Sequence, residues 1–252
     1  MRKKNMLLLA ALLAGLLLNS CTKFKNSLEN KHKSCYRLVH QKSTNGSEKK
    51  DNGVNMDLQY PVFDLWSDAA VKINNTITAN IFSKAGLETI QDTLSYNGYL
   101  QAIRQKYQKL KQDFPDAVSI SFKQKTRCKI TTFTESVVSV YISNYVFSGG
   151  AHGMEYREYL NFDPNSGEQI DIINSIEDKK IFVYLAETKL REKLNMQTYD
   201  NWSEHTFLQE FKLPKNIGMT DTSYKLIYNQ YELMAYSEGP TEIEINFKEL
   251  KY

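Results

Sequence analysis

The chain has 252 residues, of which 41% are apolar and 12% aromatic, and a formal net charge of +3. This is enough apolar material for one large or two small domains, and it excludes a disordered chain. The charge excess comes from Arg2, Lys3 and Lys4, because no acidic residue lies in positions 1–20 and the rest of the chain is neutral. A neutral domain argues against a nucleic-acid partner, because phosphate recognition needs a net basic face.

Residues 1–20 have the pattern of a lipoprotein signal peptide. The basic start precedes an apolar stretch at 6–18, which is shorter than the roughly 20 residues that span a bilayer. The sequence Leu-Asn-Ser-Cys at 18–21 resembles the lipobox of bacterial lipoproteins, in which the cysteine is lipidated. We therefore expect acyl chains such as palmitate on Cys21 and a membrane anchor that holds the protein in the cell envelope, on the periplasm-facing side. The alternative is an ordinary signal peptide beside an incidental cysteine.

Residues 21–55 are polar and predict a tether, in which the run at 35–39 has the pattern of an edge strand and His32 and His40 are expected to be solvated. Two cysteines remain after Cys21, namely Cys35 and Cys128. An oxidising compartment favours a disulfide between them, and two separate buried thiols are the alternative.

Residues 56–135 predict a smaller N-terminal α+β region. A strand over 56–63 precedes a helix that Asp64 or Ser67 can cap. One face of this helix carries Ala70, Ile73, Ile77 and Ile81. A second helix ends at residues 114–115, and its apolar face carries Tyr99, Ile103, Tyr107, Leu110 and Phe114. Alternation then predicts one strand around 118–122 and a neighbouring strand around 128–132.

Residues 136–252 predict a second α+β domain that begins with a β meander. A strand over 136–147 leads into a corner with three glycines, Gly149, Gly150 and Gly153, which leaves His152 on a short loop. A second strand runs to a turn at 163–167, and residues 170–173 return. Ser175 has the position of an N-cap for a third helix through residue 194.

The remainder of the chain predicts aromatic packing and two further strands. Residues 198–221 are irregular, with Trp202 and Phe211 expected to pack over one end of the sheet. Strands at 224–228 and 243–247 enclose a loop at 229–240. The whole pattern predicts an α+β fold, in which a mainly antiparallel sheet carries two early helices and one later helix.

His152 is the only histidine in suggestive surroundings, and three readings of it remain open. It can fix the corner by bonding a neighbouring carbonyl, bind a ligand, or act as acid or base with Glu155 or Glu232. No histidine pair has zinc spacing, and the glycine corner lacks the Lys-Ser/Thr pair of a P-loop. We therefore expect neither metal nor cofactor.

The loop at 231–240 offers exposed residue types suited to recognition, among them Tyr231, Glu232 and Tyr236. Acidic residues are frequent near the C-terminus: Glu232, Glu238, Glu242, Glu244 and Glu249. They predict either an acidic face that attracts a basic partner or a solvated strand edge.

The glycine corner at 148–153, the segments at 159–163 and 166–167, and the Asn-Gln-Tyr-Glu-Leu segment at 229–233 together resemble the RsiV-like extracytoplasmic domain. That domain belongs to a lysozyme-sensing anti-sigma factor and also occurs beside polysaccharide deacetylase domains. The resemblance covers roughly residues 56–252. It implies an α+β recognition domain of the cell envelope, with Gly149, Gly150, His152, Tyr231, Glu232 and Tyr236 as candidate ligand-binding residues.

The sequence departs from both contexts in which that domain is known. Five residues precede the apolar stretch, where an anti-sigma factor has a sigma-binding segment, and no deacetylase domain follows. We expect a non-enzymatic module on a lipid anchor that binds lysozyme or peptidoglycan. An enzyme acting on envelope glycans and a structural envelope protein are the alternatives, and the sequence sets no oligomeric state.

Overall fold

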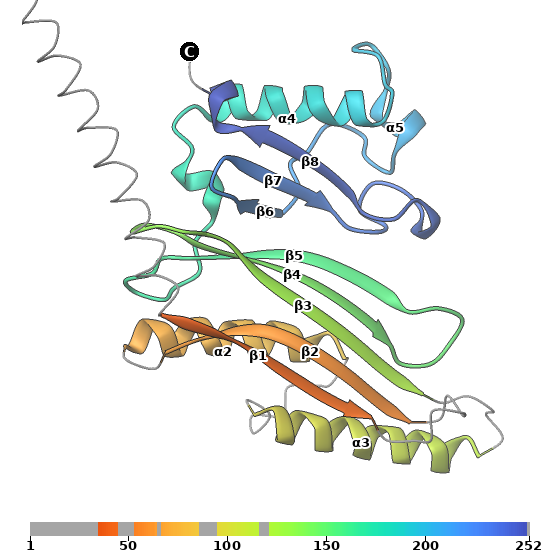
Figure 1. Cartoon of the computed structure of the whole chain (residues 1–252). Coiled ribbons are helices and arrows are strands. Elements are labelled where there is room, and N and C mark those ends of the chain that lie inside the picture. The colour runs from red at the N-terminus through yellow and green to blue at the C-terminus, as the bar shows by residue number, and fades with distance from the viewer. Residues whose placement is uncertain (1–34, 45–52, 65–66, 86–94, 116–120, 251–252) are drawn as a thin grey trace, which may run out of the picture. The chain divides into compact units, whose positions relative to one another are not determined.

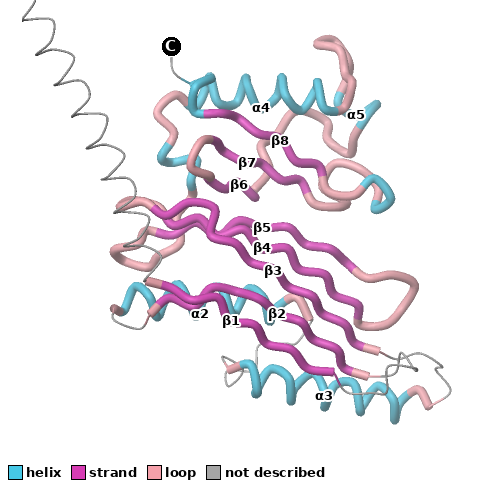
Figure 2. Tube along the Cα trace, in the orientation of Figure 1, coloured by secondary structure: helices cyan, strands magenta, loops and turns pink. Residues whose placement is uncertain are grey.

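The computed structural model describes residues 35–44, 53–64, 67–85, 95–115 and 121–250. The predicted signal peptide, Cys21 and most of the predicted tether lie outside these ranges. Leu38–Tyr252 forms one compact unit, with two β-sheets and several helices (Figures 1 and 2). The mixture of helices with mainly antiparallel strands confirms the predicted α+β class.

The larger sheet has five strands in the order β1-β2-β3-β4-β5. Their bounds are β1 (Tyr36–Thr44), β2 (Val54–Phe63), β3 (Phe122–Phe133), β4 (Val138–Phe147) and β5 (Met154–Phe162). β3, β4 and β5 form an antiparallel meander, whereas β2 and β3 are parallel because a long helical connection separates them. The predicted domain boundary at 135/136 falls in the turn between β3 and β4, which are paired strands of one sheet. The run at 35–39 leads into β1, which is the edge strand that the sequence predicted.

The first helix, α2 (Asp68–Ser83), begins at the serine that the sequence predicted as its cap. The Ser67 hydroxyl accepts a hydrogen bond from the amide of Ala70 at 3.2 Å. Ile73, Ile77 and Ile81 are buried, as their spacing predicted. Because these three side chains recur every four residues, they form one apolar stripe that packs on the sheet.

The second helix, α3 (Tyr96–Asp113), follows its predicted pattern only in the first half. Tyr99 and Ile103 are buried, and the Tyr99 ring stacks on Phe82 of α2 with centroids 4.1 Å apart. Phe114, just beyond the helix, is 59% exposed. The helix ends ahead of Pro115 because a proline disfavours the helical conformation in the residue before it.

One strand replaces the two that the sequence predicted around 118–122 and 128–132. β3 runs without interruption from Phe122 to Phe133, and residues 118–120 lie outside the described part. Gln124 and Thr126 of β3 are buried although they are polar. They interrupt the apolar alternation without interrupting the strand, which is why the pattern suggested a break.

A buried hydrogen-bond network satisfies these inward polar side chains. The Tyr99 hydroxyl of α3 donates to Gln124 Oε1 at 2.6 Å, and Gln124 Nε2 donates to the Ile81 carbonyl of α2 at 3.0 Å. The Thr126 hydroxyl donates to Asn144 Oδ1 of β4 at 2.8 Å. Both helices are therefore bound to one side chain of β3 and lie on the same face of the larger sheet.

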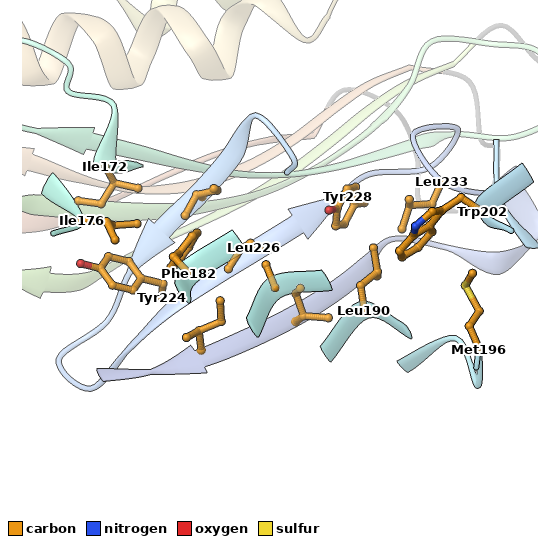
Figure 3. Close-up of a cluster of buried hydrophobic side chains, with 14 of the residues drawn as sticks. Ile172, Ile176, Phe182, Leu190, Met196, Trp202, Tyr224, Leu226, Tyr228 and Leu233 are labelled. Atoms are coloured by element: carbon orange, nitrogen blue, oxygen red, sulfur yellow. The ribbon is translucent and has the colours of Figure 1, made fainter. Parts of the chain in front are cut away.

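The smaller sheet has three antiparallel strands in the order β6-β7-β8. They are β6 (Asn216–Met219), β7 (Ser223–Tyr228) and β8 (Thr241–Asn246). Helix α4 (Lys179–Lys193) packs on this sheet, and Figure 3 shows Phe182 and Leu190 of α4 facing Tyr224 and Leu226 of β7. The short helix α5 (Trp202–His205) adds Trp202, whose ring lies 5.6 Å from Phe211. No described helix is long and apolar enough to cross a membrane.

Three boundaries differ from the sequence prediction in this half of the chain. α4 begins at Lys179 with Asp178 as its N-cap, and Ile172–Ser175 instead forms a separate 3-10 turn. The predicted return at 170–173 is reduced to a single bridge between Phe162 and Gln169. The last strand ends at residue 246, and Phe247–Leu250 forms a 3-10 turn. β6 was not predicted, because four residues that include a glycine give no periodic signal.

Side chains rather than a backbone ladder join β5 to the smaller sheet. Asn216 Oδ1 accepts from the Tyr159 amide at 2.7 Å, and Asn229 Oδ1 accepts from the Arg157 amide at 2.9 Å. Gly218 of β6 lies against the Tyr159 ring so closely that a Cβ atom there would be 1.9 Å from the ring. The two asparagines thereby cover the backbone of β5, which would otherwise be an open strand edge.

The predicted disulfide between Cys35 and Cys128 is not formed in the structure. Cys35 precedes β1 and Cys128 lies on β3, and β2 separates these strands in the sheet. Cys128 is buried, and burial raises the pKa of its thiol to about 12.

Candidate functional site

The structure brings together the two loops that the sequence singled out. The first loop, residues 148–153, connects β4 to β5, and the second, residues 229–239, connects β7 to β8. The imidazole of His152 stacks on the ring of Tyr236, with centroids 4.1 Å apart and planes at 27°. Tyr231 lies next to Tyr236, with ring centroids 6.0 Å apart. We call this group of side chains and its two loops the two-loop site.

The glycines of the first loop allow its sharp turn. Gly149 and Gly150 have φ values of +103° and +97°, a region that residues with a Cβ atom rarely adopt. Gly153 is required for a different reason, because a Cβ atom there would lie 2.4 Å from the Tyr145 side chain. The three glycines therefore set the turn and let the loop lie on Tyr145.

Both aromatic side chains of the stack bind the same carbonyl group. The Tyr236 hydroxyl donates to the Gly153 carbonyl at 2.6 Å, and Nδ1 of His152 donates to it at 3.0 Å. Because a carbonyl only accepts, Nδ1 carries the proton. Nε2 makes no hydrogen bond with the described residues, and the His152 side chain is exposed. The imidazole thus both fixes the corner and presents a ring nitrogen at the surface.

The second loop is held by its own backbone and by one buried anchor. Tyr231 has a φ of +68°, and its amide donates to the Met234 carbonyl at 3.0 Å. Leu233 is buried in the core of the smaller sheet. Tyr231 is 55% exposed, so the loop presents an aromatic side chain to solvent while Leu233 fixes its base.

The two carboxylates considered as partners of His152 are engaged elsewhere. Glu155 forms an ion pair with Arg157 at 2.7 Å. Glu232 accepts a hydrogen bond from the Asn229 amide at 3.0 Å, and its partial desolvation by the loop raises its pKa. Neither carboxylate forms a hydrogen bond or ion pair with His152 in the described structure. The arrangement is therefore a stacked aromatic surface and lacks a bonded acid and base pair.

The predicted acidic face is largely neutralised by lysines. Lys225 of β7 forms ion pairs with Glu242 at 3.3 Å and Glu244 at 2.7 Å, and Lys189 of α4 pairs with Glu249 at 2.8 Å. Lys225 lies opposite Glu244 in the register of β7 and β8. The sequence did not reveal this because the compensating lysines come from earlier elements of the chain. A solvated, ion-paired strand surface is therefore the better description.

No group of three or more His, Cys, Asp or Glu side chains in the described ranges could hold a metal ion. A pocket open to solvent, with an empty volume of about 270 Å³, lies between α3 and the start of β3. Its lining includes Ile103, Tyr107, Leu110 and Phe122, and of the two-loop site it includes only Ser148. The candidate site is therefore a surface formed by two loops, separate from this pocket.

The fold and the site define an α+β module of two sheets with an exposed aromatic loop surface. Two family models match consecutive segments of the chain. Residues 47–155 match the model described as deacetylase PdaC, and residues 170–248 match a model described as a protein of unknown function, DUF3298. His152 falls in the first matched segment and Tyr231 and Tyr236 in the second, so the two-loop site joins the two segments.

Solved structures have the same fold. A DUF3298 family member from Bacteroides fragilis is similar with a TM-score of 0.63 at 16% identity, over 84% of this chain and 90% of that chain. A DUF3298 family protein from Pseudomonas aeruginosa is similar with a TM-score of 0.58 at 17% identity, over 85% of this chain and 91% of that chain. At this identity the likeness shows the fold alone. No curated protein matches the sequence.

Proposed function

We propose that the chain is a lipid-anchored recognition protein of the cell envelope, whose two-loop site binds a protein or glycan ligand without catalysing a reaction. The observation that carries this proposal is the His152–Tyr236 stack, which is built from both loops and has an exposed imidazole. Stacked aromatic side chains on rigid loops provide contact area with little loss of conformational entropy, as binding surfaces require.

Lysozyme and peptidoglycan are the leading ligands in this proposal. Their support is the resemblance of the two loops to the RsiV-like domain, together with the matches to the deacetylase PdaC and DUF3298 models. Tyrosines such as Tyr231 and Tyr236 suit both ligands, because an aromatic ring can pack on a protein surface or on the face of a sugar.

The membrane anchor rests on the lipobox-like sequence at 18–21 and on Cys21. More than one acyl chain is needed for stable anchoring, since each buried methylene contributes about 0.8 kcal/mol. Metabolic labelling with a palmitate precursor tests this directly. We expect label on the native protein and none on the Cys21→Ala variant, and equal labelling of both would remove the anchor from the proposal.

The binding proposal is tested by titrating a fragment of residues 22–252, which retains the compact unit Leu38–Tyr252, with lysozyme and with muropeptide fragments. We expect a saturable calorimetric signal with one of them and a strong loss in Tyr236→Ala. Tyr199→Ala is the matched control, because Tyr199 is 82% exposed and lies outside both loops. No signal with either ligand, or equal losses in both variants, would exclude these ligands at this site.

One observation favours an enzyme as a second candidate. His152 lies in the segment that matches a model whose description names a deacetylase. In that case the exposed Nε2 of His152 would take or give a proton on an envelope glycan. Release of acetate or cleavage of muropeptides that disappears in His152→Ala would support an enzyme, and ligand binding without any turnover by the native protein would exclude it.

A further inference from the structure

The larger sheet has one face that neither α2 nor α3 covers. α2 and α3 pack on the face to which Gln124 and Thr126 point, and Figure 1 shows the opposite side of the strands without a described helix over it. β6 packs on one end of that opposite side, where it contacts Thr131, Ser139, Tyr159 and Asn161. We call the part of this opposite side that lies beyond β6 the open face. Because successive side chains of a strand alternate, the open face carries the residues between the buried ones. On β3 and β4 these are Lys123, Lys125, Arg127, Lys129, Tyr141, Ser143, Tyr145 and Phe147.

Lysines and aromatic rings face one another across these two strands. In the register of β3 and β4, Lys123 lies opposite Phe147, Lys125 opposite Tyr145 and Lys129 opposite Tyr141. Side chains on adjacent strands in such pairs are about 5 Å apart at their Cβ atoms. The open face therefore carries a row of cations beside a row of aromatic rings. The ring of Tyr159 of β5 lies 5.2 Å from that of Tyr141, and Gly218 of β6 covers it, so the aromatic row of the open face ends at Tyr141.

The charge of the open face is positive and is only partly compensated. The strands of this face carry five basic side chains, Lys123, Lys125, Arg127, Lys129 and Arg157, and two acidic ones, Asp57 and Glu155. Both acidic side chains form ion pairs with arginines, Asp57 with Arg127 at 2.8 Å and Glu155 with Arg157 at 2.7 Å. Glu242 of β8 lies close enough to Arg157 and Tyr141 to act on both.

Two lysines of this row remain available to a ligand. Lys125 and Lys129 are exposed and form no ion pair within the described residues. Tyr145, opposite Lys125, is 39% exposed. An uncompensated cation beside an accessible ring is a suitable contact for a ligand that combines an anionic group with a flat apolar surface.

We propose that the open face binds an extended glycan whose sugars carry carboxylate groups. The sugar rings would pack on Tyr141 and Tyr145, and the carboxylates would bind the ammonium groups of Lys125 and Lys129. These lysines are four residues apart on one strand, about 13 Å. That spacing suits a chain in which rings separate the charges, whereas duplex DNA carries a charge about every 1.7 Å along its axis.

This proposal does not depend on the function proposed for the two-loop site. Its cations come from β3, which contributes nothing to either loop, and the first loop contacts this surface only at Tyr145. Loss of binding at the open face and loss of binding at the two-loop site can therefore be separated by substitution. Lys125→Gln/Lys129→Gln should leave ligand binding at the two-loop site unchanged.

The test uses oligogalacturonate as a linear carboxylated glycan and a chitin oligosaccharide as a neutral one, both titrated into the protein at low salt. The test variant is Lys125→Gln/Lys129→Gln. The control variant is Lys109→Gln/Lys111→Gln, which removes the same charge from exposed positions of α3. Thermal melts confirm that all variants remain folded.

We expect the test variant to bind oligogalacturonate at least about tenfold more weakly, equivalent to about 1.4 kcal/mol, and the control variant to bind within twofold of the native protein. Binding should also weaken as salt rises, because exposed charges are screened. Equal losses in the two variants, no binding by the native protein, or tighter binding of duplex DNA than of oligogalacturonate would overturn the proposal.

Discussion

The ring of His152 stacks on the ring of Tyr236, although the two residues lie far apart in the sequence. The contact joins the turn after β4 to the loop after β7, and so it joins the two sheets at their loop ends. Both rings also bind the Gly153 carbonyl. Substitutions in this stack should therefore destabilise the conformation of the first loop more than the rest of the fold.

Removing one oxygen atom tests this coupling. Tyr236→Phe keeps the ring but loses the 2.6 Å hydrogen bond to the Gly153 carbonyl, at an expected cost of about 0.5–1.5 kcal/mol. Hydrogen exchange of residues 148–153 should become faster, while exchange of the β3 core stays unchanged. Tyr231→Phe is the control, because its hydroxyl makes no hydrogen bond in the described structure. Equal exchange in both variants would show that the hydroxyl does not hold the corner.

The contact between Gly218 and Tyr159 makes the junction of the two sheets sensitive to a single methyl group. In Gly218→Ala the new Cβ would meet Cδ1 and Cγ of the ring at 1.9 and 2.0 Å. These atoms lie near the base of the side chain and cannot swing away, so we expect a loss of about 1–3 kcal/mol. Gly239→Ala is the comparison, since it has a positive φ but no atom within 4 Å.

Urea unfolding measures these differences. The double variant Gly218→Ala/Tyr159→Ala should lose less stability than the sum of the two single variants, because removing the ring also removes the clash. Strict additivity would show that the two residues do not press on each other.

Asn144 is the acceptor that holds the buried network of β3 and β4 together. Asn144→Leu leaves the Thr126 hydroxyl without its 2.8 Å acceptor, and an unsatisfied buried group costs about 1–3 kcal/mol. Adding Thr126→Val should recover part of the loss, because two apolar partners need no hydrogen bond. Ser143→Ala, on the open face, should change the free energy of unfolding by less than about 0.5 kcal/mol. Failure of the second substitution to recover stability would argue against the pairing.

The sequence predicted the elements whose signal is local. Ile73, Ile77 and Ile81 recur with the helical period and are buried, and Ser67 caps the helix as expected. β3 was divided in two because Gln124 and Thr126 are polar, and only Tyr99, Ile81 and Asn144, which are distant in sequence, make their burial favourable.

The sequence indicated both loops of the candidate site but not the contact between them. The glycines around His152 are a local signal, and they indicated an exposed corner. That Tyr236 supplies the other half of the stack follows from the position of β7 and β8 beside β5, which no local pattern contains. The sequence left open an acidic face and a solvated strand edge. The ion pairs favour the strand edge, because Lys225 and Lys189, which neutralise three of the glutamates, lie on other elements of the chain.

Acid should remove one identifiable interaction. The hydrogen bond from the Arg127 guanidinium is the main cause that lowers the pKa of Asp57 from 3.8 to about 2. A carboxyl group whose pKa is lower in the folded state adds stability above its unfolded pKa, and this stability is lost as pH falls from about 4 to 2. Asp57 is 32% exposed, so solvent screening limits the contribution to about 1 kcal/mol at most.

The measurement is the free energy of unfolding against pH for the native protein and Arg127→Gln. The two curves should differ between pH 5 and 7 and converge near pH 2. A difference that stays constant down to pH 2 would mean that Arg127 acts through packing and not through the charge of Asp57.

The thiol of Cys128 should be unreactive in the folded protein. Burial raises its pKa to about 12, and the thiolate is the species that reacts. In a Cys21→Ala/Cys35→Ser variant, iodoacetamide should modify Cys128 only after denaturation. In the native protein, which retains both cysteines, non-reducing mass spectrometry should show no disulfide between Cys35 and Cys128. Rapid alkylation in the folded state, or a linked peptide pair, would contradict the burial described for β3.

The most direct test of the two-loop site as a recognition surface is hydrogen exchange of the protein with and without saturating lysozyme or muropeptide. Ligand should protect residues 148–153 and 229–239 together, and Tyr236→Ala should abolish protection of both. Protection confined to other elements, or protection of one loop alone that persists in Tyr236→Ala, would contradict the assignment of ligand binding to this pair of loops.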